Sequence, residues 1–386
     1  MVDKKVVRKN ILIITSSFPF GMSEAFLTKE LEILSDEYNI SILPILGRGE
    51  RVDYSVLKKV ELVHYKWGLL GLIQVSVILL KHKKVILQNI RHLPRNVIGG
   101  LIAGLYLKQL GDKKYDHIHA TFISTPATVA YIVSHELKIP WSATAHRWDI
   151  YDGNGFQVKN ETVDFVRAIS YVGRSELIKR GFEEEKVTVH RIPVVIMNNN
   201  PSSNKTRKLI IPANLIPVKG HEVFLGHVAP ILKNRECKLF LAGSGPLEQC
   251  ILKLIKQLSL ENHVELLGFV PQYRLHDDFR KGTFDAVILP SLDLGNGLHE
   301  GVPASLIEAI SLGVPILAAN TGSIPELFLS DFNHRWLFDP LSGPDVQNAL
   351  NYLLSSNKRE LLEAQRSAIN TEFFSNNILT LFKRYI

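Results

Sequence analysis

The sequence predicts an α/β protein with two Rossmann-like, doubly wound domains that face each other across a cleft. Its 386 residues are long for one domain and suit two domains of about 150–200 residues each. Short apolar runs alternate with helical patterns in both halves, as parallel sheets with crossover helices require. Between the halves, residues 197–205 read MNNNPSSNK, a polar stretch typical of a linker.

The first half begins with an apolar strand at residues 11–15, a turn at residues 19–21 and a helix from about Ser23. One face of that helix carries Leu27, Leu31 and Leu34. Further strands are predicted at residues 40–46, 117–120 and 141–145. After the linker, strands are predicted at residues 209–213, 238–242, 264–267, 286–289 and 316–319. Ligands of such sheets bind at the carboxyl ends of the strands, so we expect a site in the cleft between the domains.

Composition narrows the class of protein. Apolar residues are 46% and charged residues 22%, which is typical of a globular chain with a substantial core. Cys237 and Cys250 have no metal-ligand or disulfide spacing, so we expect no zinc site, no disulfide framework and a reducing cytosol. We recognise no signal peptide. The longest apolar run, residues 67–80, is shorter than the about 20 residues that a membrane-spanning helix needs.

The net charge of +7 is unevenly distributed. Residues 63–111 contain no Asp or Glu, and their basic residues are Lys66, Lys81, Lys83, Lys84, Arg91, Arg95 and Lys108. A basic and apolar segment of this kind suits an anionic membrane surface. An ordinary buried helix with solvated lysines is the alternative, and both interpretations stay open. We do not expect nucleic acid as a partner, because the segment lacks interleaved aromatic residues for base stacking.

Two strand-to-helix turns of the second half are candidate phosphate sites. In ANLIPVKGH, residues 213–221, Lys219 precedes a helix that begins near His221 and presents free backbone N–H groups. Lys219 is therefore a candidate phosphate ligand, and a solvated lysine is the alternative. In LAGSGPLE, residues 241–248, Gly243 opens a Gly-x-Gly pair, but Glu248 replaces the third glycine of a dinucleotide fingerprint. A tight turn is the simpler interpretation there.

Two glutamates eight residues apart form the third candidate. Residues 298–309 read LHEGVPASLIEA, and a helix is predicted over about residues 303–312 with Gly313 just past its end. Glu300 lies in the loop before this helix and Glu308 within it. The free N–H groups of Ala304 and Ser305 favour a phosphate, whereas carboxylates accept hydrogen bonds from hydroxyls. Together they indicate a sugar nucleotide, and plain surface charge is the alternative.

A histidine ends a strand of the first half. In SATAHRWD, residues 142–149, His146 stands at the carboxyl end of the predicted strand and is expected to face the cleft. A structural histidine is the alternative. The candidate catalytic set is therefore His146, Lys219 and Glu300.

Taken together, these segments resemble a retaining nucleotide-sugar glycosyltransferase of family 4 with the GT-B architecture. EGVPASLIEA resembles the family's Glu-x7-Glu motif, and PANLIPVKGH resembles its phosphate-binding strand and loop. LAGSGPLE, VELLGFVP, DAVILPS and NTGSIPEL resemble successive segments of the donor domain. In the first half, TAHRWD resembles the family's Thr-x-His-x-x-Asp stretch, which places a histidine by the donor. SSFPFGMSEAFLTKEL resembles the N-terminal loop and helix of members that build exopolysaccharide, capsule or lipopolysaccharide. The resemblance covers nearly the whole chain.

The resemblance implies an acceptor domain at residues 1–196, a linker at 197–207 and a donor domain at 208–369, with a final helix at 370–386 packing back on the first domain. Glu308 would hold ribose hydroxyls, and Glu300 would hold hydroxyls of the sugar, with the amides of Gly301 and Val302. Lys219 and the helix amides would stabilise the leaving diphosphate, and His146 would contact the sugar or its phosphate. The implied donor-binding set is Gly21, Asn214, Lys219, Gly243, Gly268, Phe269, Val270, Glu300, Gly301, Val302, Ala304, Ser305 and Glu308.

The implied reaction is transfer of a hexose-type sugar, with retention of configuration, from a UDP- or GDP-linked donor to a glycan or lipid-linked glycan. No cofactor is implied. The sequence has no Asp-x-Asp pair to bind a metal-bound diphosphate, so we expect the reaction to be independent of metal. The implied location is the cytoplasm, peripheral on the inner leaflet of the plasma membrane. Two residues depart from the family pattern: Asn214 replaces a common arginine, and Pro303 replaces a common glycine. A non-catalytic sugar-nucleotide-binding subunit and an NAD-dependent oxidoreductase are the alternative functions.

Overall fold

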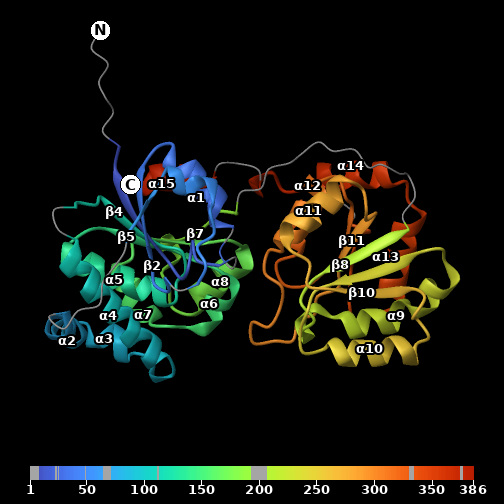
Figure 1. The fold of residues 1–386 in the computed structure, drawn as a ribbon, viewed down its shortest axis with the longest axis horizontal. Coiled ribbons are helices and arrows are strands. Elements are labelled where there is room, and N and C mark those ends of the chain that lie inside the picture. The colour runs from blue at the N-terminus through green and yellow to red at the C-terminus, as the bar shows by residue number, and fades with distance from the viewer. Residues whose placement is uncertain are drawn as a thin grey trace, which may run out of the picture. The chain divides into compact units, whose positions relative to one another are not determined.

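The computed structural model describes residues 8–21, 24, 26–47, 49–63, 71–110, 113–192, 207–329, 334–373 and 377–386. Contacts divide the chain into unit 1, residues 1–193 with 375–386, and unit 2, residues 194–374 (Figure 1). Most of the predicted linker and Lys66 of the basic segment lie outside the described residues. Each unit is a parallel sheet with helices, so the predicted α/β class with two Rossmann-like domains is confirmed.

Unit 1 has the strand order β3-β2-β1-β4-β5-β6-β7, and its described strands all pair in parallel. The strands are β1 (Asn10–Thr15), β2 (Asn39–Pro44), β3 (Glu61–Leu62), β4 (His117–Ala120), β5 (Trp141–Ala145), β6 (Phe165–Ala168) and β7 (Val187–Val189). The helices are α1 (Leu27–Ser35), α2 (Gly71–Lys81), α3 (Lys83–Leu87), α4 (Leu93–Gln109), α5 (Thr125–Leu137), α6 (Arg147–Asp152), α7 (Phe156–Thr162), α8 (Tyr171–Lys179) and α15 (Asn377–Tyr385).

Both faces of this sheet are buried, which explains the uninterrupted apolar sequence of its strands. On β1, Ile11 and Ile13 belong to one core, which includes residues of α1 and α15. Leu12 and Ile14 belong to a second core, which includes residues of α4 and α5. Side chains of a strand alternate between faces, so β1 supplies both cores.

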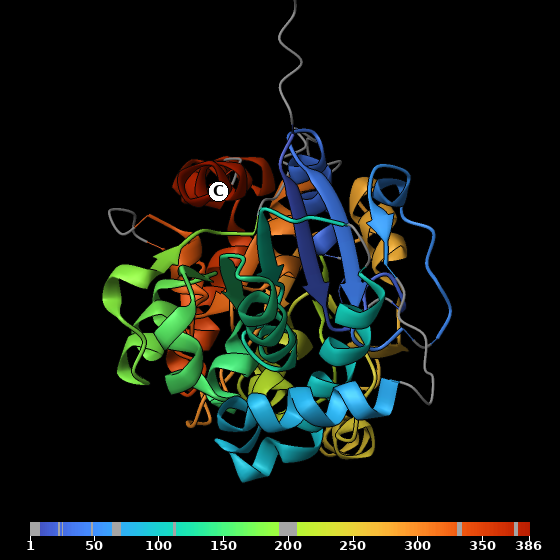
Figure 2. The same ribbon diagram turned by 90° about the vertical axis from the view of Figure 1, so that its left-hand side faces the viewer.

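The C-terminal helix α15 is part of unit 1 and packs beside α1 (Figure 1). Ile378 and Phe382 are buried in the core that contains the α1 leucines. Figure 2, turned by 90° from Figure 1, shows the helices of residues 71–109 gathered at one end of the sheet of unit 1.

Unit 2 has the order β10-β9-β8-β11-β12-β13. The strands are β8 (Lys208–Pro212), β9 (Lys238–Ala242), β10 (Val264–Gly268), β11 (Ala286–Leu289), β12 (Ile316–Ala319) and β13 (Leu337–Phe338). The helices are α9 (His221–Asn234), α10 (Glu248–Gln257), α11 (Gln272–Arg280), α12 (Ala304–Ser311), α13 (Gly343–Ser355) and α14 (Lys358–Ala368). Successive strands are added to one side of β8 as far as β10 and then to its other side from β11 onward. Such sheets bind ligands at this switch between β8 and β11.

The predicted strands agree with the observed ones to within two residues at each end, but the first helix begins later than predicted. It starts at Leu27 rather than near Ser23, which itself lies outside the described residues. Glu24 belongs to the preceding turn, because its carboxylate accepts hydrogen bonds from the backbone N–H groups of Ser16, Ser17 and Phe18 at 2.7–3.2 Å.

Buried neutral histidines should make the protein sensitive to mild acid. Burial lowers the pKa of His117 to about 3 and that of His221 to about 4, against about 6.5 in an unfolded chain. Below pH 6.5 the unfolded chain therefore takes up protons that the native protein does not bind. Each histidine makes its full contribution to the free energy of unfolding above about pH 6.5. That contribution decreases between pH 6.5 and pH 3–4, by at most about 1.4 kcal/mol per pH unit.

Urea unfolding at pH 7, 6 and 5 tests this prediction. The free energy of unfolding is expected to fall with pH, and His117→Gln is expected to lose less of it per pH unit than the parent. Equal slopes for the two proteins would contradict the prediction.

Candidate functional site

Two loops at the carboxyl ends of the neighbouring strands β8 and β11 of unit 2 bring a lysine, a serine and a glutamate together. Lys219 ends a short 3-10 helix after β8, Ser291 follows β11, and Glu300 precedes α12. The Lys219 ammonium lies 2.5 Å from a carboxylate oxygen of Glu300, and the Ser291 hydroxyl donates to the same oxygen at 2.9 Å. The Lys219 side chain is 20% exposed and the Glu300 side chain is 13% exposed. The structure thus joins two of the three predicted catalytic residues in one ion pair.

Close backbone packing holds this cluster in place and explains two glycines. Gly220 has φ of +68°, and a Cβ there would lie 2.0 Å from the carbonyl oxygen of Pro290. Gly322, after β12, has φ of +56°, and its Cβ would lie 2.1 Å from the carbonyl oxygen of Glu300. The left-handed φ and the contact both exclude a side chain. Ser323 also donates its N–H to that carbonyl at 3.1 Å.

The Gly-x-Gly pair after β9 has a structural function that accounts for both glycines. A Cβ on Gly243 would lie 2.1 Å from the carbonyl oxygen of Ala213, and one on Gly245 would lie 2.4 Å from that of Leu215. The turn therefore packs against the loop that carries Lys219. This packing supports the tight-turn interpretation and removes the main sequence argument for a dinucleotide fingerprint.

The second glutamate has its own partners on a neighbouring helix. Glu308 accepts a hydrogen bond from the side-chain amide of Gln272 at 2.7 Å, and its other oxygen lies 3.0 Å from Nε2 of His276. Gln272 and His276 are four residues apart on α11, so they share one face of that helix. Glu308 is therefore a partly buried, oriented carboxylate rather than a freely solvated one.

The helix that follows Glu300 and contains Glu308 leaves backbone donors at its start. α12 spans Ala304–Ser311, with Pro303 as its N-cap and Gly313 at φ of +91° just past its end, so the predicted helix is confirmed. Pro303 makes no side-chain cap. The first N–H groups of a helix have no partner within it, and a ligand or water must satisfy them.

The other predicted donor residues of unit 2 lie on loops of the same sheet edge. Asn214 is exposed after β8, whereas Gly301 and Val302 are partly buried beside Glu300, and Ser305 lies in the first turn of α12. Gly268 ends β10 with φ of +66°. Phe269 and Val270 line a cavity of about 400 Å³ together with Phe240 and Arg274.

The remaining predicted residues, His146 and Gly21, belong to unit 1. The His146 ring is buried and packs on Phe26 and Phe122, with ring centroids 5.0 and 4.7 Å away. His146 and Asp149 cap the start of α6 reciprocally, and burial lowers the pKa of His146 to about 3, so the imidazole is neutral. Gly21 is exposed at φ of +76°. The predicted contact of either residue with a donor stays a prediction.

Unit 1 has a cavity of about 580 Å³ at the carboxyl ends of β1, β2 and β4. Its walls are mostly apolar and include Leu46, Ile98, Phe122 and Trp148. Arg95 is the cation in its lining, and its guanidinium lies 3.6 Å from the carboxylate of Asp152. The cavity can therefore take an apolar group next to an anion.

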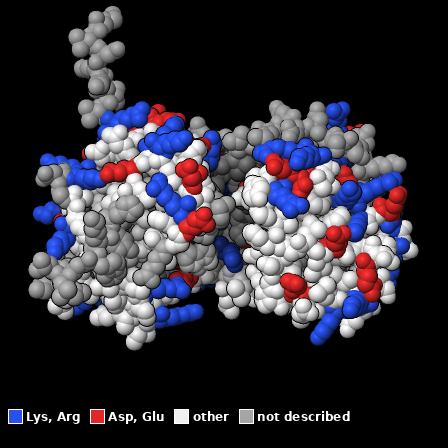
Figure 3. Space-filling view, in the orientation of Figure 1, with Lys and Arg blue, Asp and Glu red and all other residues white. Residues whose placement is uncertain are grey.

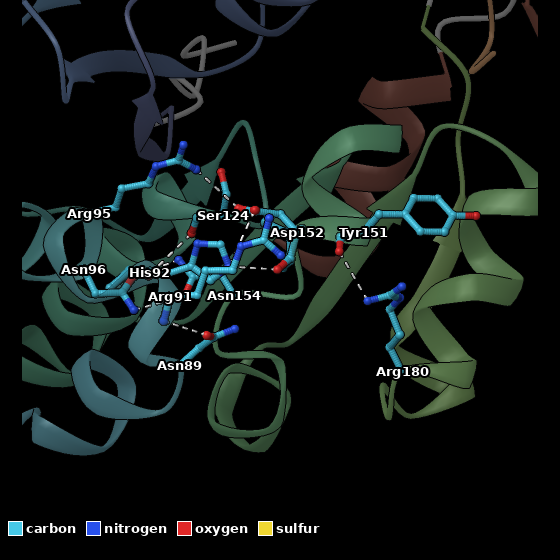
Figure 4. A network of polar contacts seen from close by, with 12 residues as sticks. Asn89, Arg91, His92, Arg95, Asn96, Ser124, Tyr151, Asp152, Asn154 and Arg180 are labelled. Atoms are coloured by element: carbon cyan, nitrogen blue, oxygen red, sulfur yellow. Dashed lines mark hydrogen bonds and ion pairs between the residues drawn. The ribbon is translucent and has the colours of Figure 1, made fainter. Parts of the chain in front are cut away.

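A buried polar network supports one wall of this cavity. Figure 4 shows Asn96 and Asn154 turned toward each other, and their amide groups exchange two hydrogen bonds of 2.7 and 3.0 Å. Lys159, which is fully buried, donates to the backbone carbonyls of Ile123, Ser124 and Asn154 at 2.7–2.8 Å. These contacts fix the loop after β4, which lines the cavity.

Sequence reasoning missed three residues of the site: Ser291, Gln272 and His276. Ser291 could have been found, because it directly follows a predicted strand, at the sheet edge where ligands bind. The spacing of Gln272 and His276 predicts a shared helix face, but it does not indicate which carboxylate that face meets.

Two α/β units, each with a parallel sheet, are the architecture of the GT-B fold. Residues 195–370 match the family model described as "Glycosyl transferases group 1". The second half of the chain is thus similar to glycosyltransferase group 1 domains, in agreement with the sequence resemblance.

Curated relatives are similar over part of their length. The putative colanic acid biosynthesis glycosyltransferase WcaL of Escherichia coli K12 is 30% identical over 182 residues, which cover 45% of this chain and 43% of the relative. The amylovoran biosynthesis glycosyltransferase AmsK of Erwinia amylovora is 27% identical over 213 residues, covering 53% and 51%. The chain thus spans about half the length of these relatives or less.

Solved structures are similar over nearly the whole chain. The Anabaena protein Alr3699/HepE, in complex with UDP-glucose, has a TM-score of 0.67 at 18% identity and covers 98% of both chains. The lipopolysaccharide outer core galactosyltransferase WaaB, in its apo form, has a TM-score of 0.67 at 16% identity, covering 97% of this chain and 99% of the other. At these identities the likeness establishes the fold alone.

Proposed function

We propose that this protein is a glycosyltransferase of bacterial surface polysaccharide biosynthesis, which moves a hexose-type sugar from a UDP- or GDP-linked donor to a glycan. The observation that carries the proposal is the contact between Lys219 and Glu300 in a glycosyltransferase group 1 domain. The two residues come from loops after different strands, and their charges suit the two chemical parts of a sugar nucleotide. The names of the relatives support the polysaccharide context.

In this proposal the donor replaces the ion pair. The diphosphate takes over the Lys219 ammonium, together with N–H groups at the start of α12. Glu300, still held by Ser291, accepts hydrogen bonds from hydroxyls of the transferred sugar. Lys219 then stabilises the negative charge that develops on the leaving diphosphate, which is the largest expected contribution to catalysis.

Glu308 is proposed to accept hydrogen bonds from the ribose hydroxyls. Its present donors, Gln272 and His276, satisfy the carboxylate in the free protein and orient it for the ribose. The loop of Gly268, Phe269 and Val270 is proposed to frame the base. Configuration is proposed to be retained without a protein nucleophile, so Glu300 binds and orients the sugar and does not attack it. No metal is assigned to the diphosphate, and turnover is expected to survive EDTA.

The acceptor is proposed to be a lipid-linked glycan, with its anionic and apolar parts in the cavity of unit 1. Arg95 suits a phosphate, whereas Ile98, Phe122 and Trp148 suit an apolar chain. Exposed apolar side chains of the neighbouring segment extend this surface: Val77, Leu80, Leu87 and Ile90 are 57–83% exposed. We propose that this segment rests on the inner leaflet of the plasma membrane.

Charge reversal tests the membrane proposal. Among the described residues, no helix combines the length and apolar composition needed to cross a bilayer. In Figure 3, Lys and Arg side chains lie along the left edge of unit 1. Replacing Lys81, Lys83 and Lys84 with glutamate is expected to abolish most binding to anionic liposomes, since each lysine contributes about 1 kcal/mol near such a surface. Unchanged sedimentation with liposomes would contradict the proposal, and reversal of Lys253, Lys256 and Lys281 in unit 2 is the control.

A thermal-shift screen of nucleotide sugars tests the donor proposal. A ligand at a hundredfold excess over its Kd stabilises the protein by about 2.7 kcal/mol, so a bound donor should raise the Tm measurably. UDP-linked and GDP-linked sugars are expected to raise the Tm by different amounts. The sugar that raises the Tm of the parent should not raise that of Glu300→Ala. No shift with any nucleotide sugar, or the same shift in Glu300→Ala, would overturn the proposal.

A further inference from the structure

Two histidines and a glutamate meet outside the candidate site, where the end of α2 packs on the end of α5. His82 lies between α2 and α3, and His135 and Glu136 lie in the last turn of α5. One potential ligand atom from each lies within 4.8 Å of the others. Nothing in the proposed sugar transfer uses these residues.

The arrangement of the two rings matches a shared metal ion. The His82 and His135 ring centroids are 5.1 Å apart, with the rings nearly perpendicular. Zinc–nitrogen bonds of about 2.0–2.1 Å and tetrahedral geometry place two ligating imidazole centroids about 5 Å apart. The Glu136 carboxylate already lies 2.6 Å from Nε2 of His82, so a small side-chain movement would admit an ion between them.

The environment also suits a cation. His82 is 2% exposed, so its ring is held by the surrounding packing and loses little freedom on binding. His135 is exposed and can turn toward the ion. Both α5 residues lie at the carboxyl end of a helix, where the unpaired carbonyl groups favour positive charge.

One existing contact opposes a metal. The Lys81 ammonium lies 2.8 Å from a Glu136 oxygen, with the lysine side chain 51% exposed. An exposed pair of this kind is weak, because water screens it and the lysine loses freedom in making it. A divalent ion would displace Lys81 from Glu136 and would complete its own coordination with water.

We propose that His82, His135 and Glu136 form a binding site for a divalent transition-metal ion, with Zn²⁺ as the best match to two imidazoles and one carboxylate. The ion would join the end of α2 to the end of α5. It would also release Lys81 from Glu136, and Lys81 belongs to the segment that we propose for membrane contact. The metal site itself does not depend on the proposed transferase function.

Titration of the untagged full chain with Zn²⁺ in a calorimeter, and with Co²⁺ followed by visible absorption, tests the proposal. The expected result is one site and the d–d absorption of Co²⁺ in a nitrogen and oxygen environment. His82→Ala and His135→Ala are each expected to weaken binding more than about 100-fold, since each loses a direct ligand. His135→Ala changes an exposed side chain, so its effect is not a folding defect.

Lys81→Gln provides the sharpest test, because it removes the competing cation and no ligand. It is expected to strengthen Zn²⁺ binding about two- to fivefold. His263→Ala, in unit 2, is the control and should bind like the parent. The proposal is overturned if no binding occurs at about 100 μM Zn²⁺, if the histidine variants bind like the parent, or if a thiolate charge-transfer band shows that Co²⁺ binds at Cys250.

Discussion

Replacing Lys219 with alanine is expected to lower kcat about 10²- to 10³-fold with the donor identified by thermal shift. Lys219 is the cation that pairs with Glu300 in unit 2, and in the proposed reaction it faces the charge that develops on the diphosphate. The fold should survive, because the lysine side chain is 20% exposed and the remaining Glu300 carboxylate keeps its hydrogen bond from Ser291. Steady-state kinetics with the purified protein measure the effect.

Lys233→Ala provides the matched control, since Lys233 is an exposed lysine in the last turn of α9. Its kcat should equal that of the parent. If Lys219→Ala also keeps the parental kcat, the leaving group is not stabilised by this lysine. If Glu300→Ala and the parent turn over equally, the protein instead fits the alternative of a non-catalytic sugar-nucleotide-binding subunit.

Replacing Lys159 with methionine is expected to destabilise the protein by about 3–5 kcal/mol. The Lys159 ammonium is fully buried and donates to three backbone carbonyls at 2.7–2.8 Å. Methionine has a similar length but no donor, so these buried carbonyls would lose their partner. The loop after β4 depends on these bonds, so the cavity of unit 1 should also lose its shape. Urea unfolding measures the change in the free energy of unfolding.

Lys179→Met is the control for this substitution, because Lys179 is exposed at the end of α8. A surface change of this kind should alter the free energy of unfolding by no more than about 0.5 kcal/mol. A loss below about 1 kcal/mol for Lys159→Met would show that water or a relaxed loop replaces the three hydrogen bonds.

Much of the fold was predictable because both faces of each sheet are buried. The predicted strands at residues 117–120, 141–145 and 286–289 have the same bounds as β4, β5 and β11, and all their residues are buried. β6 was not predicted, because Arg167 interrupts its apolar sequence. The structure shows that Arg167 is buried in an ion pair with Glu30 of α1 at 2.7 Å, a contact between residues 137 positions apart that no local pattern reveals.

The sequence was enough to predict which residues belong to the site, but not which of them contact one another. Lys219 and Glu300 were each recognisable at the end of a strand or the start of a helix. Their ion pair depends on the order in which β8, β11 and β12 lie side by side. The same limit applies to Glu308, whose partners on α11 are more than 30 residues away in sequence. Side-chain pairing across loops follows from sheet order, which local periodicity does not determine.

The position of α15 in unit 1 has a consequence for the synthesis of the chain. Phe382 and Tyr385 of α15 lie against Phe165 of β6, with ring centroids 6.3 and 4.4 Å away. Residues 194–374, unit 2, are synthesised after β6 and before α15. At about 5–20 residues per second their translation takes roughly 10–40 s, so α15 is made that much later than β6. During that time Phe165 of the ribosome-bound chain lacks the aromatic partners that α15 supplies in the folded protein.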